Sequence, residues 1–325
     1  MKKIFTIILS LFMALQISNS QVTEGEAKLR KQSADTIMGW TKGAIFSVNL
    51  SQTSLKNWAA GGQNSVSVNG LFSAFASNKQ EKFMWDNSLD LGYGLLKQGK
   101  DADFLKTDDK IDFLSKYGRK ASENWYYAGL FNFKTQMTAG YNYPNTTDEI
   151  SNLLAPAYIL GALGMDYKSG KYFSLFLSPV TIKTTIVNDQ VLADAGAFGV
   201  EGATYDMAGN VVTPGNKTRS ELGGYLRAIY SRNDFKSEIL ENISFTSKVD
   251  LFTNYLDSPD HVDVSWETLV SLKVNKYISI NFNTHLLYDH DIKIGIDTDG
   301  DNVIDKSGPR TQFKEILGVG FSYKF

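Results

Sequence analysis

The sequence predicts an all-β protein, a single antiparallel transmembrane β-barrel of about 12 strands with short periplasmic turns and long extracellular loops. Three observations support this prediction. The chain begins with the pattern of an export signal, the remainder alternates apolar and polar residues with a period of two, and short connections alternate with long ones.

The N-terminal segment has the composition of a cleaved signal peptide. Two lysines precede an apolar stretch from Ile4 to Ile17, and the small residues Ser18 and Ser20 follow it. We therefore expect residues 1–20 to be removed during export. An uncleaved membrane anchor is the alternative, although the stretch is short for a spanning helix. No cysteine follows, so attachment of a lipid at that point is excluded.

The bulk composition excludes several classes of function. The 325 residues include no cysteine, which excludes disulfides, thiolate metal sites and cysteine nucleophiles. A net charge of −2 gives no electrostatic basis for binding nucleic acid. After the signal, no apolar run is long enough for a membrane-spanning helix. Because 13% of the residues are aromatic, these exclusions leave a secreted β protein or an outer-membrane barrel.

The C-terminal segment shows the alternation most clearly. One face carries Phe313, Glu315, Leu317, Val319, Phe321, Tyr323 and Phe325, and the other carries Lys314, Ile316, Gly318, Gly320, Ser322 and Lys324. An aromatic face opposite a small or polar face is typical of a strand between lipid and an aqueous lumen. The terminal Phe325 resembles the signal by which outer-membrane proteins reach the barrel-insertion machinery. We therefore expect this machinery and outer-membrane lipid as partners, and no nucleic acid.

The predicted barrel covers residues 43–325, and a periplasmic lead-in covers residues 21–42. The predicted strands begin near Gly43, Asn64, Lys82, Asp109, Asn124, Ala157, Tyr172, Thr218, Ile243, Val262, Tyr277 and Thr311. An even number of strands places both termini in the periplasm. Pro179 interrupts the seventh strand and predicts a bulge, because proline cannot donate to the ladder. Residues 235–242 predict a polar turn or a short helix in a longer periplasmic connection.

The predicted lumen contains charges of both signs. By the alternation within each strand, the inward-facing charged residues are Asp86, Asp90, Asp112, Lys116, Lys134, Glu221, Arg227, Lys248, Asp250, Glu267 and Lys273. A ring of one sign would have indicated ion selectivity. The balanced set leaves two interpretations open: salt-bridged packing that fills the interior, or a solute path lined by these groups.

One outer loop has the spacing of a calcium-binding loop. Asp297, Asp299, Asp301 and Asp305 occupy its first, third, fifth and ninth positions. The glycine of the sharp turn and the final glutamate of that motif are both missing. Weak calcium binding and a solvated acidic loop therefore remain alternatives, and we expect no other cofactor.

Catalysis has little support in the sequence. His285 lies on a polar strand face, and Ser265 and Ser271 lie on the inward face of the neighbouring strand. No nucleophile motif accompanies them. We therefore predict that the chain is not an enzyme and that His285 is a hydrogen-bonded lumen residue.

Three outer loops place glycine next to aromatic residues, at residues 57–62, 140–144 and 194–200. Such loops either fold inward as a plug or ligand-contact surface, or pack at the barrel mouth. These loops, together with the runs WDNSLDLGYGLLKQG, WYYAGLFNFKTQ, LAPAY and KEILGVGFSYKF, give the chain a resemblance to a family of exported outer-membrane β-barrels known only as a domain of unknown function. The resemblance implies the barrel and the outer membrane, but no substrate or catalytic residue. The acidic loop is not part of the family pattern.

The leading functional hypothesis is a passive channel or transporter for a small polar solute. A closed structural or surface-binding barrel is the alternative, and a membrane-embedded hydrolase is a third, weaker possibility.

Overall fold

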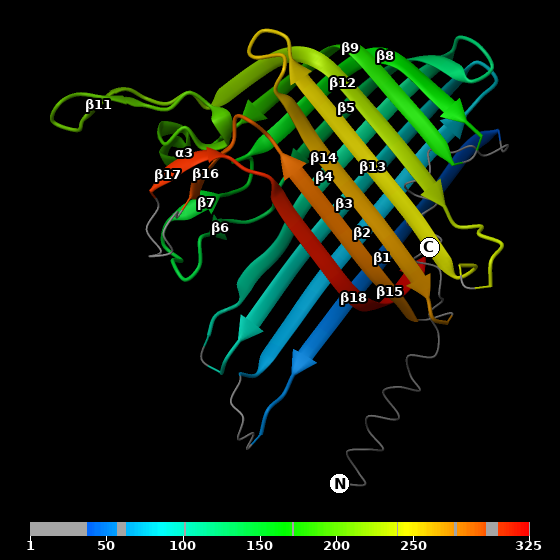
Figure 1. Ribbon diagram of the computed structural model, residues 1–325, viewed down its shortest axis with the longest axis horizontal. Coiled ribbons are helices and arrows are strands. Elements are labelled where there is room, and N and C mark those ends of the chain that lie inside the picture. The colour runs from blue at the N-terminus through cyan, green and yellow to red at the C-terminus, as the bar shows by residue number, and fades with distance from the viewer. Residues whose placement is uncertain are drawn as a thin grey trace.

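A computed structural model describes residues 38–56, 63–100, 102–170, 172–238, 240–275, 278–296 and 305–324. Within these ranges, twelve antiparallel strands close into one barrel (Figure 1). The strands are β1 (Gly39–Thr53), β2 (Ser65–Lys79), β3 (Phe83–Gln98), β4 (Leu105–Lys120), β5 (Trp125–Thr135), β8 (Ala157–Ser169), β9 (Phe173–Ile186), β12 (Thr218–Arg232), β13 (Ile243–Asn254), β14 (Val262–Lys273), β15 (Ile278–Tyr288) and β18 (Gln312–Lys324). Each strand neighbours the next one of this series, and β18 closes the ring by pairing with β1. The predicted barrel and its strand number are confirmed.

The long connections carry small elements of their own at one end of the barrel (Figure 1). They form three hairpins and two short helical segments: β6 (Gly140–Tyr141) with β7 (Glu149–Ser151), β10 (Thr204–Tyr205) with β11 (Val211–Thr213), β16 (Lys293–Ile296) with β17 (Lys306–Pro309), α3 (Gln190–Asp194) and the 3₁₀ turn η1 (Ala197–Gly199). We call this the outer end. No helix in the described ranges is long and apolar enough to cross a bilayer.

The strand boundaries follow the prediction closely, with two exceptions. β1 begins at Gly39, where position 43 was expected, and β4 begins at Leu105, where 109 was expected. In both cases the ladder continues beyond the alternating apolar segment, because the neighbouring strand extends equally far and offers backbone partners. The ladder therefore includes residues 39–42, which the sequence assigned to the lead-in. The signal segment, the rest of the lead-in before residue 38, and Phe325 lie outside the described residues.

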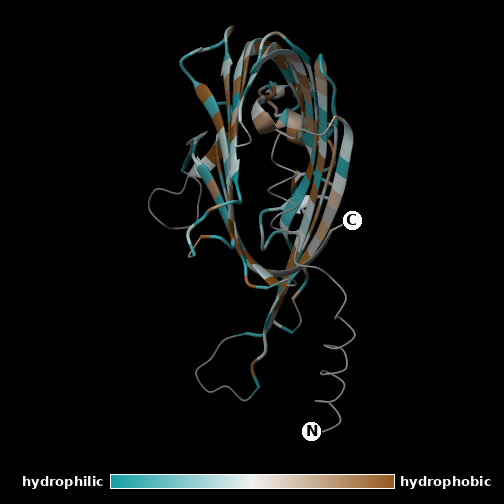
Figure 2. Ribbon diagram, turned by 90° about the vertical axis from the view of Figure 1, so that its right-hand side faces the viewer, coloured by the Kyte–Doolittle hydropathy of each residue, from teal (hydrophilic) through white to brown (hydrophobic). Residues whose placement is uncertain are grey.

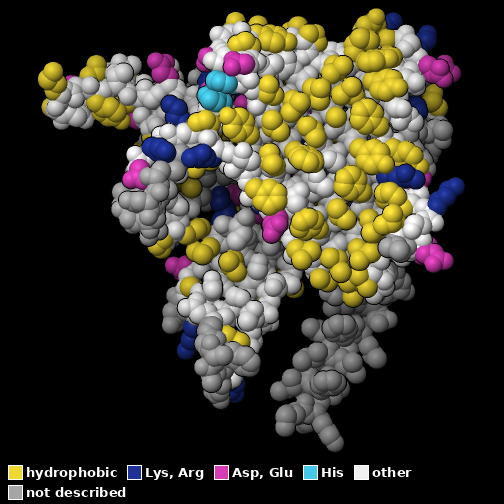
Figure 3. Space-filling view, viewed as in Figure 1, with side chains coloured by type: hydrophobic (Ala, Val, Ile, Leu, Met, Phe, Trp, Pro, Cys, Tyr) yellow, Lys and Arg dark blue, Asp and Glu magenta, His cyan; other side chains and the backbone are white. Residues whose placement is uncertain are grey.

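The two faces of each strand have opposite chemistry. Outward-facing Tyr127, Leu163 and Leu317 expose 63%, 66% and 71% of their surface, whereas the inward-facing neighbours Ala128 and Asn132 are buried. Apolar side chains cover the outer wall seen in Figure 3. Figure 2, a view turned by 90°, shows the strands as a closed and flattened ring. The alternation predicted from the sequence therefore corresponds to an apolar exterior and a mainly polar interior.

Pro179 lies in a bulge of β9, as predicted. β9 contains one residue more than β8 between residues 177 and 180, and one residue more than β12 between residues 178 and 181, so both registers shift there. The Ser178 hydroxyl donates to the Leu163 carbonyl at 2.8 Å and also contacts the Val180 carbonyl at 2.9 Å. Gly164 faces the bulge, and a side chain there would meet the Leu177 carbonyl and the Ser178 Cα. The bulge thus requires glycine on the neighbouring strand.

The connection from β12 to β13 is the long polar turn that the sequence indicated. The backbone N–H groups of Leu240 and Glu241 both donate to the Ser237 carbonyl. This connection joins the strands at the end opposite the hairpins, which we call the inner end.

Candidate functional site

The lumen brings the predicted charged residues together. Eight of them are buried: Asp86, Asp112, Lys116, Glu221, Arg227, Lys248, Asp250 and Glu267. Asp90, Lys134, Lys273 and His285 are half-buried. Residues that the sequence analysis did not single out complete the ion pairs, notably Lys110, Asp166, Lys168, Lys183, Arg219, Asp263, Asp289 and Asp291. The same alternation in β4, β8, β9 and β12 would have identified several of them.

The innermost layer of charge joins β3, β4 and β8. Lys116 Nζ lies 2.7 Å from Asp166 Oδ1, and both side chains are almost fully buried. Lys168 Nζ lies 3.0 Å from Asp86 Oδ2 and 3.8 Å from Asp166 Oδ2. Burial of these charges is tolerated because each one faces an opposite charge.

Apolar side chains pack beside this layer. Leu114, Ala128, Leu130, Ala162, Phe176, Tyr225 and Phe252 form one buried cluster inside the barrel. These residues come from β4, β5, β8, β9, β12 and β13, which form one half of the ring. This half of the lumen is therefore packed.

The middle layer reaches across the lumen. Lys110 on β4 lies 3.6 Å from Glu267 on β14, and these strands are six places apart in the ring of twelve. Glu267 also pairs with Lys248 at 2.6 Å. On the other wall, Asp112 lies 3.7 Å from Lys110 and 3.9 Å from Lys134. The opposite walls are thus connected by side chains.

Next to this layer, Asp250 is held by two neighbours on β12. The Tyr225 hydroxyl donates to Asp250 Oδ1 at 2.5 Å, and Arg227 Nε lies 3.6 Å from the same oxygen. Both partners come from the neighbouring strand and are buried, so this cluster belongs to the wall.

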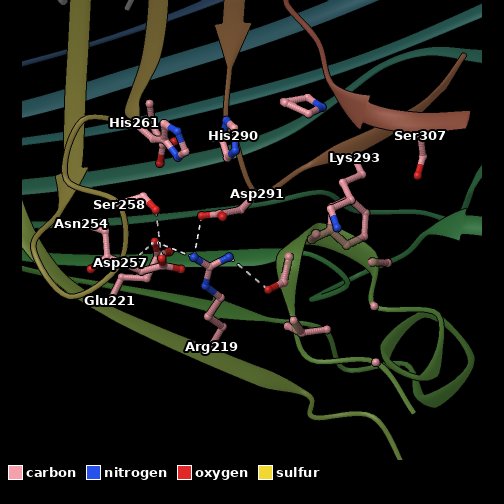
Figure 4. Close-up of a pocket in the computed structure, with 18 of the residues that line it drawn as sticks. Arg219, Glu221, Asn254, Asp257, Ser258, His261, His290, Asp291, Lys293 and Ser307 are labelled. Atoms are coloured by element: carbon pink, nitrogen blue, oxygen red, sulfur yellow. Dashed lines mark hydrogen bonds and ion pairs between the residues drawn. The ribbon is translucent and has the colours of Figure 1, made fainter. Parts of the chain in front are cut away.

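The outermost layer connects the wall to the loops. Lys183 lies 2.6 Å from Asp263, 3.2 Å from Asp289 and 3.5 Å from Glu221. Arg219 extends the network, since its guanidinium donates to Glu221 at 3.2 Å, to Asp291 at 2.5 Å and to the Gly199 carbonyl at 3.1 Å (Figure 4).

The outer mouth contains a cavity of about 740 Å³. The segment from Ala195 to Gly202 forms one side of it, and His261 and His290 lie on another side with their rings stacked 3.6 Å apart (Figure 4). Of the two alternatives for this segment, the structure shows packing at the mouth with direct contact to the cavity. The loop at residues 57–62 lies outside the described residues.

Asp194 fixes the loop that forms this side of the mouth. Its Oδ1 accepts hydrogen bonds from the Gly215 backbone N–H and from Gln190, each at 2.7 Å. The backbone hydrogen bond from Gly215 is the main reason why the pKa of Asp194 lies below its ordinary value.

Two further cavities lie inside the barrel. The first, of about 360 Å³, shares Asp263 with the mouth cavity. The second, of about 110 Å³, shares Lys110, Glu267, His285, Lys314 and Asp108 with the first. The three cavities therefore form a series from the outer mouth to the middle of the lumen.

The wall of the smallest cavity is chemically different from the packed half. Asn49, Asn69, Gly70, Gly92, Asn281, Asn283 and Gly318 contribute to it, on β1, β2, β3, β15 and β18. We call these residues the amide–glycine wall. Small and uncharged polar groups leave space in this half of the lumen.

His285 is a hydrogen-bonded lumen residue, as predicted. Its Nε2 lies 3.0 Å from the Ser265 hydroxyl, and both side chains border the cavity of about 360 Å³. They face the interior, away from the apolar outer wall. The absence of catalysis stays a prediction.

The proposed calcium loop is not placed by the structure. Asp297, Asp299 and Asp301 lie outside the described residues, and Asp305 is exposed at the edge of this gap. In the described ranges, no group of three or more His, Asp or Glu side chains could hold a metal ion. Calcium binding stays a prediction.

Comparison with solved structures finds many chains that are similar at low sequence identity, including the following two. The crystal structure of the COG4313 outer membrane channel from Pseudomonas putida F1 is 11% identical, with a TM-score of 0.40, and the alignment covers 90% of this chain and 97% of that one. The translocator domain of the autotransporter NalP from Neisseria meningitidis is 9% identical, with a TM-score of 0.34 and coverages of 93% and 92%. Neither one assigns a solute or a residue role to this chain.

No curated protein matches the chain. Residues 50–141, from the end of β1 to β6, match the family described as "Protein of unknown function (DUF3078)". Over this segment, the chain is similar to the DUF3078 family of proteins of unknown function.

Proposed function

We propose that this protein is an outer-membrane β-barrel that forms a narrow passage for a small polar solute. The membrane part of the proposal is supported by the apolar exterior of the barrel. Trp85, Phe131 and Trp266 expose 41%, 43% and 48% of their surface on the outer wall, while the charged groups described above face inward. A closed ladder leaves no sheet edge along most of this wall, as a barrel in a bilayer requires.

The series of three cavities carries the proposal of a passage. The cavities share lining residues from the mouth to the middle of the barrel, and polar groups line each of them. The amide–glycine wall continues this series with small uncharged groups. A solute that moves along it meets hydrogen-bond donors and acceptors without a barrier of one charge sign.

The interior also limits the size of the solute. The buried apolar cluster fills part of the lumen, and the ion pair between Lys110 and Glu267 lies between the opposite walls. A solute must therefore be small enough to pass beside this pair, or must displace it.

Conductance of the purified full-length protein in planar bilayers tests the proposal. We expect small, discrete current steps and a reduced current when a small neutral polar solute is added. A series of such solutes of increasing size should give a sharp cut-off. A sealed bilayer under all these conditions, both for the natural protein and for Lys110→Met, would contradict the passage.

A closed barrel is the second candidate, and the contact of Lys110 with Glu267 across the lumen favours it. In this case the barrel would serve as a structural or surface-binding protein. The same recordings separate the two functions, because a permanently closed barrel conducts neither ions nor solutes.

The location can be tested separately by fluorescence quenching. In vesicles that contain brominated lipids, the emission of the protein should be strongly quenched, because Trp85 and Trp266 face the lipid in the proposed orientation. The variant Trp266→Phe should lose part of the quenchable emission. Unchanged emission in brominated and ordinary lipid would contradict the membrane location.

Export and processing are also part of the proposal. Removal of residues 1–20 would give a mature protein that begins at Gln21. Mass spectrometry of the protein from outer-membrane fractions should find this N-terminus, and an intact Met1 would contradict cleavage.

A further inference from the structure

The ladder between β1 and β18 is much shorter than its neighbours. Only Ile45–Asn49 of β1 are in register with β18, whereas all positions from Gly39 to Thr53 pair with β2 on the other side. On β18, positions 312–321 pair with β15. The described residues 50–53 of β1 and 312–319 of β18 therefore have one paired edge each, and these edges face one another. We call this part of the barrel the seam notch.

The outside of the seam notch is apolar. Leu50 on β1 and Leu317 and Val319 on β18 expose 69%, 71% and 57% of their surface. These side chains belong to the lipid-facing series of their strands, so the notch begins within the apolar belt of the wall. In Figure 1, β1 and β18 meet near the inner end and diverge toward the outer end.

The inside of the notch is polar and borders a cavity. Asn49, Ile316 and Gly318 line the 110 Å³ cavity next to the amide–glycine wall. Among the described residues, Asn49 Oδ1 has no hydrogen-bond partner although the atom is buried. A side chain at position 318 would lie 3.2 Å from Asn49 Cγ, so glycine there leaves room for the Asn49 side chain on the inner side of the notch.

Unpaired backbone is costly in hydrocarbon and is tolerated at membrane depth only where it is buried in protein or lines a water-filled cavity. The β18 side of the seam notch fulfils this condition, since Lys314, Ile316 and Gly318 line the cavity. The arrangement offers polar backbone groups and the side-chain carbonyl of Asn49 on the lumen side. On the lipid side it offers leucine and valine side chains.

We propose that the seam notch is a lateral opening between the lumen and the outer leaflet of the membrane, and that it accepts a single-chain amphiphile. The head of this molecule donates a hydrogen bond to Asn49 Oδ1, and its alkyl chain lies against Leu50 and Leu317. A fatty alcohol has this chemistry. The lateral opening goes beyond the proposed passage along the barrel axis and does not depend on it.

Spin labelling tests the opening directly, because the chain contains no native cysteine. Ser51 of β1 and Ser67 of β2 are register partners. Both lie on the lumen side of their strands, between lipid-facing residues. Ser67 pairs on both sides, whereas Ser51 borders the notch. A nitroxide on Ser51→Cys should therefore show a several-fold higher ratio of oxygen to nickel-chelate collisions than one on Ser67→Cys, because oxygen concentrates in lipid.

Addition of 1-dodecanol to the same vesicles should lower the oxygen collisions at position 51 and leave position 67 unchanged. The variant Asn49→Leu should weaken this response, since it removes the acceptor. Equal collision ratios at positions 51 and 67, or an equal response of both to dodecanol, would overturn the proposal.

A disulfide across the notch provides the second test. Continuing the register beyond Asn49 and Gly320 places Leu50 opposite Val319. In Leu50→Cys/Val319→Cys, oxidation should abolish the dodecanol response of a β1 label, and reduction should restore it. Axial conductance should persist in the oxidised protein. Loss of conductance with an intact dodecanol response would contradict the lateral opening, and a sealed but dodecanol-responsive barrel would contradict only the axial passage.

Discussion

Lys110 and Glu267 lie on opposite strands of the barrel, and yet their charged groups are 3.6 Å apart. Each of them also has a partner on its own side, since Asp112 lies near Lys110 and Lys248 lies near Glu267. The contact across the lumen can therefore break without leaving either charge unpaired. This property makes the pair an adjustable contact between the opposite walls.

The variant Lys110→Met should increase the single-channel conductance by roughly two-fold, because the ammonium no longer bridges the walls. Glu267 keeps Lys248, and Asp112 keeps Lys134 and the amide of Asn132, so folding should be preserved. Planar-bilayer recordings measure the effect. Lys120→Met, which removes an exposed lysine at the inner end of β4, is the control. Equal conductance of the two variants would show that Lys110 does not limit the passage.

The buried pair of Lys116 and Asp166 should be essential for stability. Among the described residues, Lys116→Met leaves Asp166 with the more distant Lys168, and loss of one partner of a buried pair costs about 3–5 kcal/mol. We expect a lower unfolding midpoint in urea, which the difference in gel mobility between the folded and the unfolded barrel measures. Asp166→Asn in the same background should restore part of the stability, because the unpaired charge is removed. No difference between Lys116→Met and the natural protein would contradict the role of the pair.

Gly164 should tolerate no side chain. In Gly164→Ala, the added carbon would meet the Leu177 carbonyl and approach Ser178 Cα to 2.7 Å, so the bulge must shift at a cost of about 1–3 kcal/mol. Gly161→Ala on the same strand is the matched control, since an added carbon there has no neighbour within 4 Å. Urea unfolding of both variants measures the difference. Equal midpoints would mean that the bulge adapts freely.

The mouth loop should loosen in acid. The hydrogen bonds of Asp194 hold its pKa below the ordinary value of 3.8, so the ionised form stabilises the folded loop. This stabilisation is complete above pH 3.8 and is lost as the pH falls through the lower pKa of the folded loop. The protection of the Gly215 amide against hydrogen exchange, measured relative to its intrinsic exchange rate, should therefore fall below this pH. Asp194→Asn should show a weaker dependence on pH, and identical profiles would contradict the assignment.

Many lumen residues could be predicted from the alternation in the sequence, because a strand places every second side chain on the same side. Asp86, Lys116 and Glu267 were predicted in this way and are buried inside. The ion-pair partners on opposite sides of the ring could not be predicted from the sequence. Lys110 and Glu267 are far apart in sequence, and only closure of the barrel and its flattened section bring them together.

The sequence by itself determined the period-two pattern, the number of strands and the location of the bulge at Pro179, because these depend on the local geometry of extended chains and on the missing N–H of proline. The tertiary structure decided which charges meet, which half of the lumen is packed and where the ring is weakly joined. Register, closure and loop packing set these features, and each of them depends on contacts between residues that are distant along the chain.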